Sequence, residues 1–219
     1  HLRPRRQRQM CIRDSLTYGE AHQRVASFAN WLIDQGVEPG DRVAIAMRNY
    51  PEWMQAYWAV TSVGAAVVGM NAWWIGPEML YALEDSTPKV LIVDKERLNQ
   101  LGEHRANVSN IKLVGVRFPE AEIGVTPWND IVSGNTQQPM IGIDTDSDAC
   151  IFYTSGTTGR PKGAQLTHRG CVSNVWSMLF SAGLQRILGI QKGLINADDE
   201  PPIGCALLTT PLFHVTANN

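Results

Sequence analysis

Short runs of consecutive apolar residues recur along the chain, and segments with helical periodicity separate them. The runs lie within residues 42–47, 65–68, 89–93 and 111–115. A continuous apolar run of this length is typical of a strand that is buried on both faces of a parallel sheet. Because strands that alternate with helices form βαβ units, we predict an α/β fold with layered, largely parallel sheets and flanking helices.

The segments between the runs contain helix signals. Thr17 and Glu20 have the spacing of a capping box before a helix with apolar side chains every three or four residues. Pro51 is suited to the first position of another helix. Residues 117–147 show little periodicity, so we predict a long connection there. The predicted helices span residues 16–36, 51–63, 76–85 and 95–104.

Composition excludes several classes of protein. The chain has 219 residues, of which 44% are hydrophobic, and a net charge of −2. These values exclude a disordered or collagen-like chain and argue against a dedicated nucleic-acid binder. The chain contains no uninterrupted run of about eighteen apolar residues that could form a transmembrane helix. The four cysteines are too widely spaced for a zinc site, so we expect free thiols in a cytoplasmic protein.

The first residues differ in charge from the rest of the chain. Residues 1–13 contain five arginines and no acidic residue. A basic arm of this kind could bind nucleic acid or a membrane surface. It could also serve as a transit peptide, but it lacks the serines and the apolar face of one. Residues 8–15 also resemble translated adapter sequence. We therefore predict that residues 1–15 are a non-native arm.

A strand followed by a polar loop contains the residues best suited to chemistry. The loop combines hydroxyl residues, glycines and one lysine. Glycines let successive backbone N–H groups converge on an anion, and the hydroxyls and the ammonium add donors and positive charge. This combination indicates a polyphosphate site. Its candidate ligands are Thr154, Ser155, Gly156, Thr157, Thr158, Gly159 and Lys162.

The spacing excludes a Walker A loop. Counted from Gly156, that pattern requires glycine at position 161 and serine or threonine at position 163, where this chain has Pro161 and Gly163. The residues after Lys162 suggest a strand, and helical periodicity resumes only after Thr167, a suitable N-cap. We therefore predict a strand–loop–strand hairpin.

Residues Tyr153 to Gly163 resemble the signature of the adenylate-forming (AMP-binding) superfamily, aromatic-T-S/T-G-S/T-T-G-x-P-K-G, at every fixed position. The Pro-Leu-Phe-His sequence at 211–214 is similar to a second family motif. The resemblance is strongest to acyl-CoA synthetases, and it identifies residues 16–219 as the N-terminal portion of the large AMP-binding domain. We expect the chain to be truncated, without the small C-terminal domain. Weaker similarities follow in family order at residues 16–20, 36–45, 49–53 and 64–71.

The resemblance implies that ATP activates a carboxylic acid to an acyl-adenylate, and that the acyl group then passes to coenzyme A. The loop residues would hold the β- and γ-phosphates with Mg²⁺, and His214 would act as the catalytic residue that positions the acyl substrate. His214 could instead be a hydrogen-bonded core histidine. Because further family motifs would follow Asn219, we expect the isolated chain to be inactive.

Two other functions fit the same residues. One is a non-catalytic module that binds a nucleotide or phosphate, and the other is the adenylation domain of a peptide synthetase. Trp73 and Trp74 are more typical of packing than of a ligand-stacking surface. Asp144, Asp146 and Asp148 alternate as in a metal loop but lack the glycine and the terminal glutamate of an EF-hand, so we predict a solvated turn.

Overall fold

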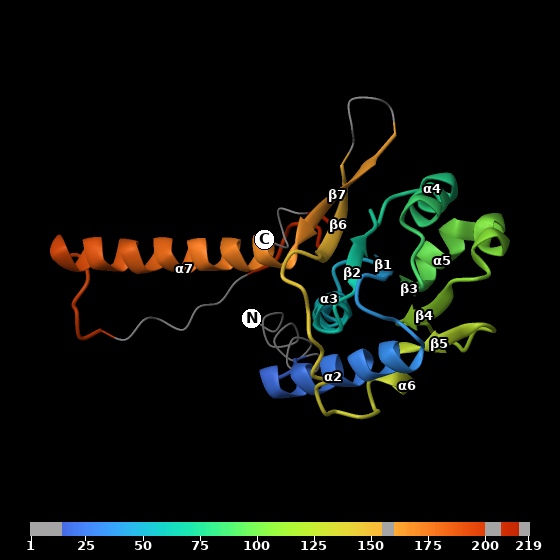
Figure 1. Cartoon of the computed structure of the whole chain (residues 1–219), viewed down its shortest axis with the longest axis horizontal. Coiled ribbons are helices and arrows are strands. Elements are labelled where there is room, and N and C mark those ends of the chain that lie inside the picture. Colours follow the sequence, from blue (N-terminus) through green and yellow to red (C-terminus); the bar gives the residue numbers. More distant parts are fainter. Residues whose placement is uncertain (1–14, 155–159, 200–206, 215–219) are drawn as a thin grey trace, which may run out of the picture.

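The computed structural model describes residues 15–154, 160–199 and 207–214, and these residues form one seven-stranded sheet. Its strands are β1 (Arg42–Ala46), β2 (Ala66–Gly69), β3 (Val90–Asp94), β4 (Lys112–Val116), β5 (Val125–Pro127), β6 (Asp148–Thr154) and β7 (Lys162–Thr167). Their order is β5-β4-β3-β1-β2-β6-β7 (Figure 1). Neighbouring strands are parallel, except that β6 and β7 are antiparallel. The predicted α/β fold with a largely parallel sheet is confirmed.

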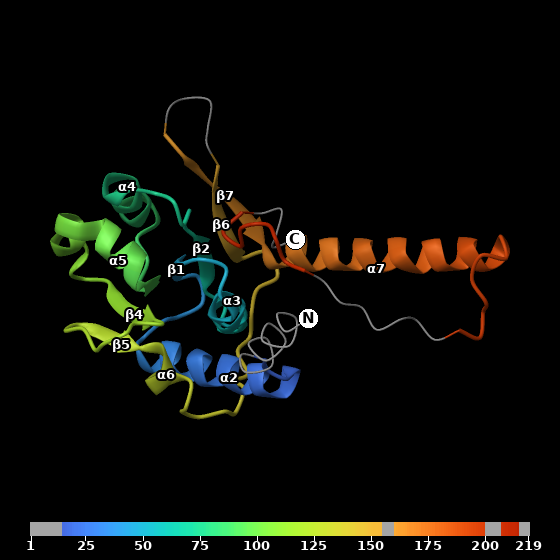
Figure 2. The ribbon, with the colours of Figure 1, turned by 180° about the vertical axis from the view of Figure 1, so that it is seen from behind.

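Helices cover both faces of the sheet (Figure 2). The described helices are α2 (Tyr18–Asp34), α3 (Pro51–Ser62), α4 (Gly76–Ser86), α5 (Lys95–Leu101), the 3₁₀ helix η1 (Gly102–Val108), α6 (Trp128–Ile131) and α7 (His168–Gln191). Side chains of α2, α3 and α6 share one hydrophobic cluster with one face of the sheet, and those of α4 and α5 share a second. Along β1, Val43 and Ile45 join the first cluster, whereas Ala44 and Ala46 join the second. This alternation explains why the strand is apolar throughout.

The predicted start of the first helix is confirmed. The Glu20 amide donates to Thr17 Oγ1 over 3.2 Å, and the Thr17 amide donates to Glu20 Oε2 over 2.7 Å. Both bonds of the capping box therefore form, and they satisfy amides that the first turn would otherwise leave unpaired. The helix ends before Gly36, whose φ of 80° lies in the left-handed region that favours glycine.

Two predictions of secondary structure were wrong. The segment 117–147 is not one long connection, because it contains β5 and α6. Trp128 of α6 packs on Phe28 of α2 with ring centroids 4.7 Å apart, a distant contact that local periodicity does not reveal. The helix expected over 95–104 changes at Gly102, where a φ of 52° ends the α-helix and a 3₁₀ helix follows.

A buried ion pair joins the carboxyl ends of the central strands. Arg97 Nη1 lies 2.9 Å from Asp94 Oδ2, and both side chains are nearly inaccessible to solvent. Asp94 Oδ2 also accepts a bond of 3.2 Å from the amide of Arg48, which follows β1. Arg97 Nε donates over 2.8 Å to the carbonyl of Ala72, which follows β2. One ion pair thus holds the loops after β1 and β2 to the end of β3.

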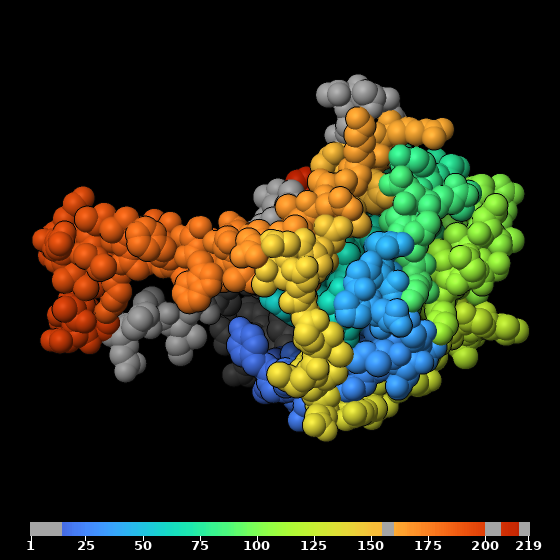
Figure 3. All heavy atoms as spheres, in the orientation of Figure 1, coloured from blue at the N-terminus to red at the C-terminus, as the bar shows by residue number. Residues whose placement is uncertain are grey.

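Helix α7 extends away from the sheet in both ribbon views, and it forms the projection seen in Figure 3. Its start agrees with the predicted N-cap, since the Gly170 amide donates to Thr167 Oγ1 over 3.2 Å. Of its residues, all of them described, only Gly189 is buried, while Trp176 and Phe180 are 68% and 73% exposed. Within the described ranges, no helix is both long and apolar enough to cross a membrane.

Replacing Arg97 tests the buried ion pair. We expect Arg97→Met to lower the free energy of unfolding by about 3–5 kcal/mol, because it leaves the Asp94 carboxylate buried without its cation. Urea denaturation of the 219-residue chain measures the change. Arg169→Met is the matched control, since Arg169 pairs with Asp146 at the surface, where an ion pair stabilises little. Equal losses in the two variants would contradict this account.

Candidate functional site

The predicted strand–loop–strand hairpin is confirmed by the antiparallel pairing of β6 and β7. Thr154 and Lys162 form the last cross-strand pair before the loop, and Thr154 Oγ1 donates to the Lys162 carbonyl over 3.4 Å. Both residues are exposed. The structure therefore brings a hydroxyl and a lysine together at the base of the predicted phosphate loop. The other candidate ligands lie outside the described residues, namely Ser155, Gly156, Thr157, Thr158 and Gly159.

Glycine is required beside Lys162 for steric reasons. A Cβ atom at Gly163 would lie 2.8 Å from Ile151 Cγ2, closer than real Cβ contacts allow. Gly163 is paired with Tyr153 across the hairpin. A side chain at this position would therefore force the hairpin to adjust next to Lys162.

Helix α4 holds the strand that enters the loop. Tyr153 donates its hydroxyl to Asp85 Oδ2 over 2.6 Å, and its ring packs against the edge of Trp74. Burial and the nearby Asp85 carboxylate raise the pKa of Tyr153, because both disfavour the phenolate. Trp74 is itself buried, as the packing interpretation predicted.

The same helix contacts the strand that leaves the loop. Tyr81 donates its hydroxyl to the Pro161 carbonyl over 3.3 Å, and the Arg160 guanidinium lies 5.4 Å from the Tyr81 ring centroid. This support was not predicted from the sequence. The available signal was the four-residue spacing of Tyr81 and Asp85, which places both polar side chains on one face of the helix.

The His214 segment lies at the same edge of the sheet as the loop. Because β1, β2 and β6 are parallel, their carboxyl ends meet there. A Cβ atom at Gly69, the last residue of β2, would lie 3.2 Å from the Phe213 carbonyl oxygen and 2.8 Å from the Phe152 ring. The His214 amide donates to the Pro211 carbonyl over 3.0 Å, which closes a turn.

Aromatic and cationic groups flank this segment. The rings of Trp73 and Phe213 meet edge to face with centroids 5.3 Å apart, and the Arg48 guanidinium lies 5.1 Å from the Trp73 ring centroid. Trp73 nevertheless remains 56% exposed. Packing therefore accounts for one side of Trp73 and leaves the other open.

Cys150 of β6 is not an activated nucleophile. Cys150 and Cys171 are free, as predicted, whereas Cys11 and Cys205 lie outside the described residues. Burial raises the pKa of Cys150 to about 12, so its thiol stays protonated at neutral pH. Burial also raises the pKa of the neighbouring Tyr57, whose hydroxyl lies 4.0 Å from Cys150 Sγ.

Acidic residues do not form a metal cluster in the described part of the chain. The predicted solvated turn is confirmed at Asp144, whose side chain accepts from the Asp146 amide. Asp146 pairs in turn with Arg169, which lowers the pKa of its carboxyl. These carboxylates are thus engaged in a turn and a surface ion pair.

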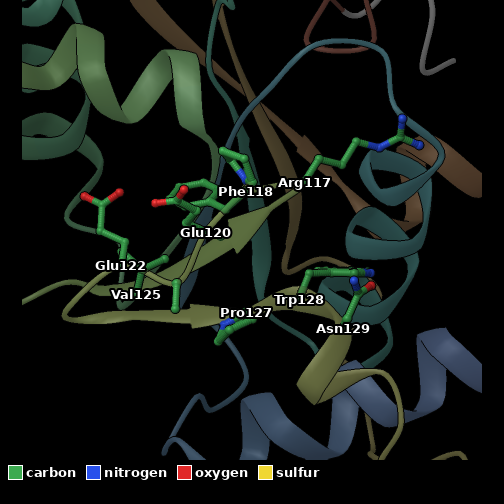
Figure 4. Close-up of a pocket in the computed structure, with 11 residues that line it drawn as sticks. Arg117, Phe118, Glu120, Glu122, Val125, Pro127, Trp128 and Asn129 are labelled. Atoms are coloured by element: carbon green, nitrogen blue, oxygen red, sulfur yellow. The ribbon is translucent and has the colours of Figure 1, made fainter.

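A separate pocket lies at the far edge of the sheet, beside β4 and β5 (Figure 4). Phe118, Val125 and Trp128 supply apolar lining, and Glu120 and Glu122 supply carboxylates. Lys95 and Arg105 both bond to Glu122 and lower its pKa, so this charge is already paired. The pocket shares no residue with the loop hairpin or with the His214 segment.

The chain is similar in sequence and fold to known AMP-binding enzymes. A family model described as AMP-binding enzyme matches residues 3–218. A feruloyl-CoA synthase of Amycolatopsis sp is 34% identical over 93% of this chain. An L-proline–[L-prolyl-carrier protein] ligase of Streptomyces coelicolor is 34% identical over 74% of it. The crystal structure of an anthranilate CoA ligase in complex with anthranoyl-AMP superposes with a TM-score of 0.64 and 27% identity, over 68% of this chain and 29% of that one.

The chain spans about a third of the length of these curated relatives. It covers 35% of the feruloyl-CoA synthase and 31% of the carrier-protein ligase. The match therefore concerns one part of each relative.

Replacing Tyr153 tests the contact between the hairpin and α4. We expect Tyr153→Phe to lower the free energy of unfolding at neutral pH by about 1 kcal/mol, because it removes the hydroxyl donor. Above about pH 10, the unfolded wild type loses the Tyr153 proton while the folded state, in which the pKa of Tyr153 is raised, retains it, so the contribution of Tyr153 to wild-type stability falls as the pH rises. Phenylalanine lacks this contribution, and the difference between the proteins should narrow. Urea denaturation below and above that pH measures it, and a constant difference would refute the assignment.

Proposed function

The chain belongs to the AMP-binding enzyme family, and from this membership we propose that the full-length protein is an acid–thiol ligase. It converts a carboxylic acid and ATP into an acyl-adenylate and pyrophosphate, and it then transfers the acyl group to coenzyme A. The observation that supports this proposal is the hairpin, in which Thr154 and Lys162 meet at the base of a glycine- and hydroxyl-rich loop.

The first half-reaction requires that negative charge be offset on the carboxylate, the α-phosphate and the departing pyrophosphate. Lys162 supplies a mobile positive charge on the side of the β- and γ-phosphates, and the hydroxyl of Thr154 adds a hydrogen-bond donor beside it. Mg²⁺, when bound, neutralises further charge on the phosphates. Because the hairpin pairs Thr154 with Lys162 before reaction, these two residues are in place to stabilise charge as it develops.

His214 serves the acyl side of the site in this proposal. It lies in the segment that contacts the carboxyl edge of the sheet, next to the strand that leads into the loop. A carboxylate near His214 would therefore lie on the same edge as the phosphates held by the loop. His214 orients this substrate, and the positive groups of the loop act on ATP.

Names of relatives guide the choice of substrate. The feruloyl-CoA synthase and the anthranilate CoA ligase are both named for aromatic acids, so we propose an aromatic carboxylic acid as the first substrate class to test. ATP–pyrophosphate exchange by the full-length protein across aromatic, short aliphatic and long aliphatic acids decides this. Exchange that is confined to aliphatic acids would refute the aromatic assignment.

The carrier-protein ligase among the relatives favours a second candidate, in which the acceptor is the thiol of a carrier protein. Both functions share the adenylation step, so ATP–pyrophosphate exchange does not distinguish them. Transfer of a radiolabelled acyl group to coenzyme A or to a carrier protein identifies the acceptor. Nucleotide binding without any exchange would instead favour a non-catalytic module.

Replacing Lys162 tests the loop assignment. In the full-length protein, we expect Lys162→Ala to lower kcat for adenylation by about 100-fold or more, because one well-directed positive group is lost from the transition state. Lys192→Ala is the matched control. It removes the same charge at the C-cap of α7, the helix that extends away from the sheet. Undiminished activity of Lys162→Ala would rule out the proposed role of the loop.

A further inference from the structure

We propose that Asn49 is a positioning residue that seats the segment 210–214, and with it His214, at the carboxyl edge of the sheet. The inference deepens the proposed function and rests on it, because it concerns the acyl side of the same site. In the sequence, Asn49 stands out only as part of the weak family similarity at residues 49–53.

Two hydrogen bonds connect Asn49 to the segment. Its Nδ2 donates to the Thr210 carbonyl over 2.8 Å, and its Oδ1 accepts from the Leu212 amide over 2.9 Å. Asparagine and glutamine present a donor and an acceptor side by side on one planar group. A bidentate contact of this kind fixes both the distance and the orientation of the bound backbone.

Asn49 is itself held by its neighbours. The Arg48 amide donates to the buried Asp94 carboxylate, and the Arg48 carbonyl accepts from the Tyr50 amide over 2.7 Å. Helix α3 begins directly afterwards at Pro51, whose ring restricts the backbone. The side chain therefore projects from a short, constrained turn between β1 and α3.

The segment also contacts the sheet on other sides. Leu212 is 2% exposed and belongs to the hydrophobic cluster shared with α3. The Phe213 carbonyl occupies the space left by the missing side chain of Gly69, and the Phe213 ring meets Trp73. These contacts bury Leu212 and leave His214 exposed, whereas the two Asn49 bonds determine the register of the segment against the end of β1.

Loss of Asn49 should affect the two substrates differently. His214 is two residues beyond Leu212, so movement of the segment changes the position of the imidazole. The loop hairpin has its own supports on α4, through Tyr153 and Tyr81. Binding of the carboxylic acid should therefore weaken, while binding of ATP is retained.

Hydrogen exchange of the 219-residue chain tests the contact without relying on activity. In Asn49→Ala we expect faster exchange in the peptide that covers residues 207–214, because the Leu212 amide loses its acceptor. Asn30→Ala is the matched control. Asn30 Nδ2 donates to the Gln137 carbonyl over 2.8 Å, which is also a long-range amide-to-backbone bond, but at α2. Unchanged exchange of 207–214 in Asn49→Ala, or an equal increase in Asn30→Ala, would overturn the inference.

Kinetics of the full-length protein test the functional part. We expect Asn49→Ala to raise KM for the carboxylic acid by about tenfold, the size expected for lost hydrogen bonds, while KM for ATP stays unchanged. Asn49→Asp keeps the acceptor for Leu212 but places a carboxylate oxygen against the Thr210 carbonyl oxygen, so its KM for the acid should rise at least as much as that of Asn49→Ala. A proportional rise of both KM values would overturn the positioning role.

The two proposals fail in different ways. If the wild-type protein shows no ATP–pyrophosphate exchange with any carboxylic acid, the proposed function is refuted. Hydrogen exchange of the backbone amides still decides whether Asn49 seats the segment. Suppose instead that the wild type is active, and that Asn49→Ala has the same KM for the carboxylic acid and the same hydrogen exchange over residues 207–214. Only the role of Asn49 is then refuted.

Discussion

The buried ion pair of Asp94 and Arg97 is the interaction on which the carboxyl edge of the sheet depends. Its carboxylate accepts from the amide after β1, and its guanidinium donates to the carbonyl of Ala72 after β2. Buried charges of this kind are tolerated only when they are paired and hydrogen-bonded. The requirement to satisfy them fixes the loops that contain Asn49 and Trp73, and both residues contact the segment that includes His214.

The two halves of the proposed site have separate supports at this edge. Helix α4 holds the entering and leaving strands of the loop hairpin through two tyrosine hydroxyls. Asn49 holds the acyl-side segment by a bidentate contact with its backbone. Because β2 pairs with both β1 and β6, the two supports are joined through the sheet itself. This division allows one side of the site to be altered by mutation while the other stays in place.

Much of the fold followed from patterns that are short in sequence. The apolar runs predicted β1 to β4, the capping box predicted the start of α2, and the spacing around Lys162 excluded a Walker loop in favour of the observed hairpin. The prediction was wrong over 117–147, since β5 exists through its pairing with β4. A strand of three residues has too little periodicity to be recognised without its partner.

The sequence alone determined the fold class and the loop that led to the family, because strand burial, helix capping and a glycine-rich turn depend on neighbouring residues. Tertiary structure alone decided which residues support that loop and the His214 segment. Asn49 and Leu212 are separated by 163 positions, and Tyr153 and Asp85 by 68. The first contact forms where parallel strands bring their carboxyl ends to one edge, and the second forms where α4 packs against β6. Residues that are close in sequence encode neither of these meetings.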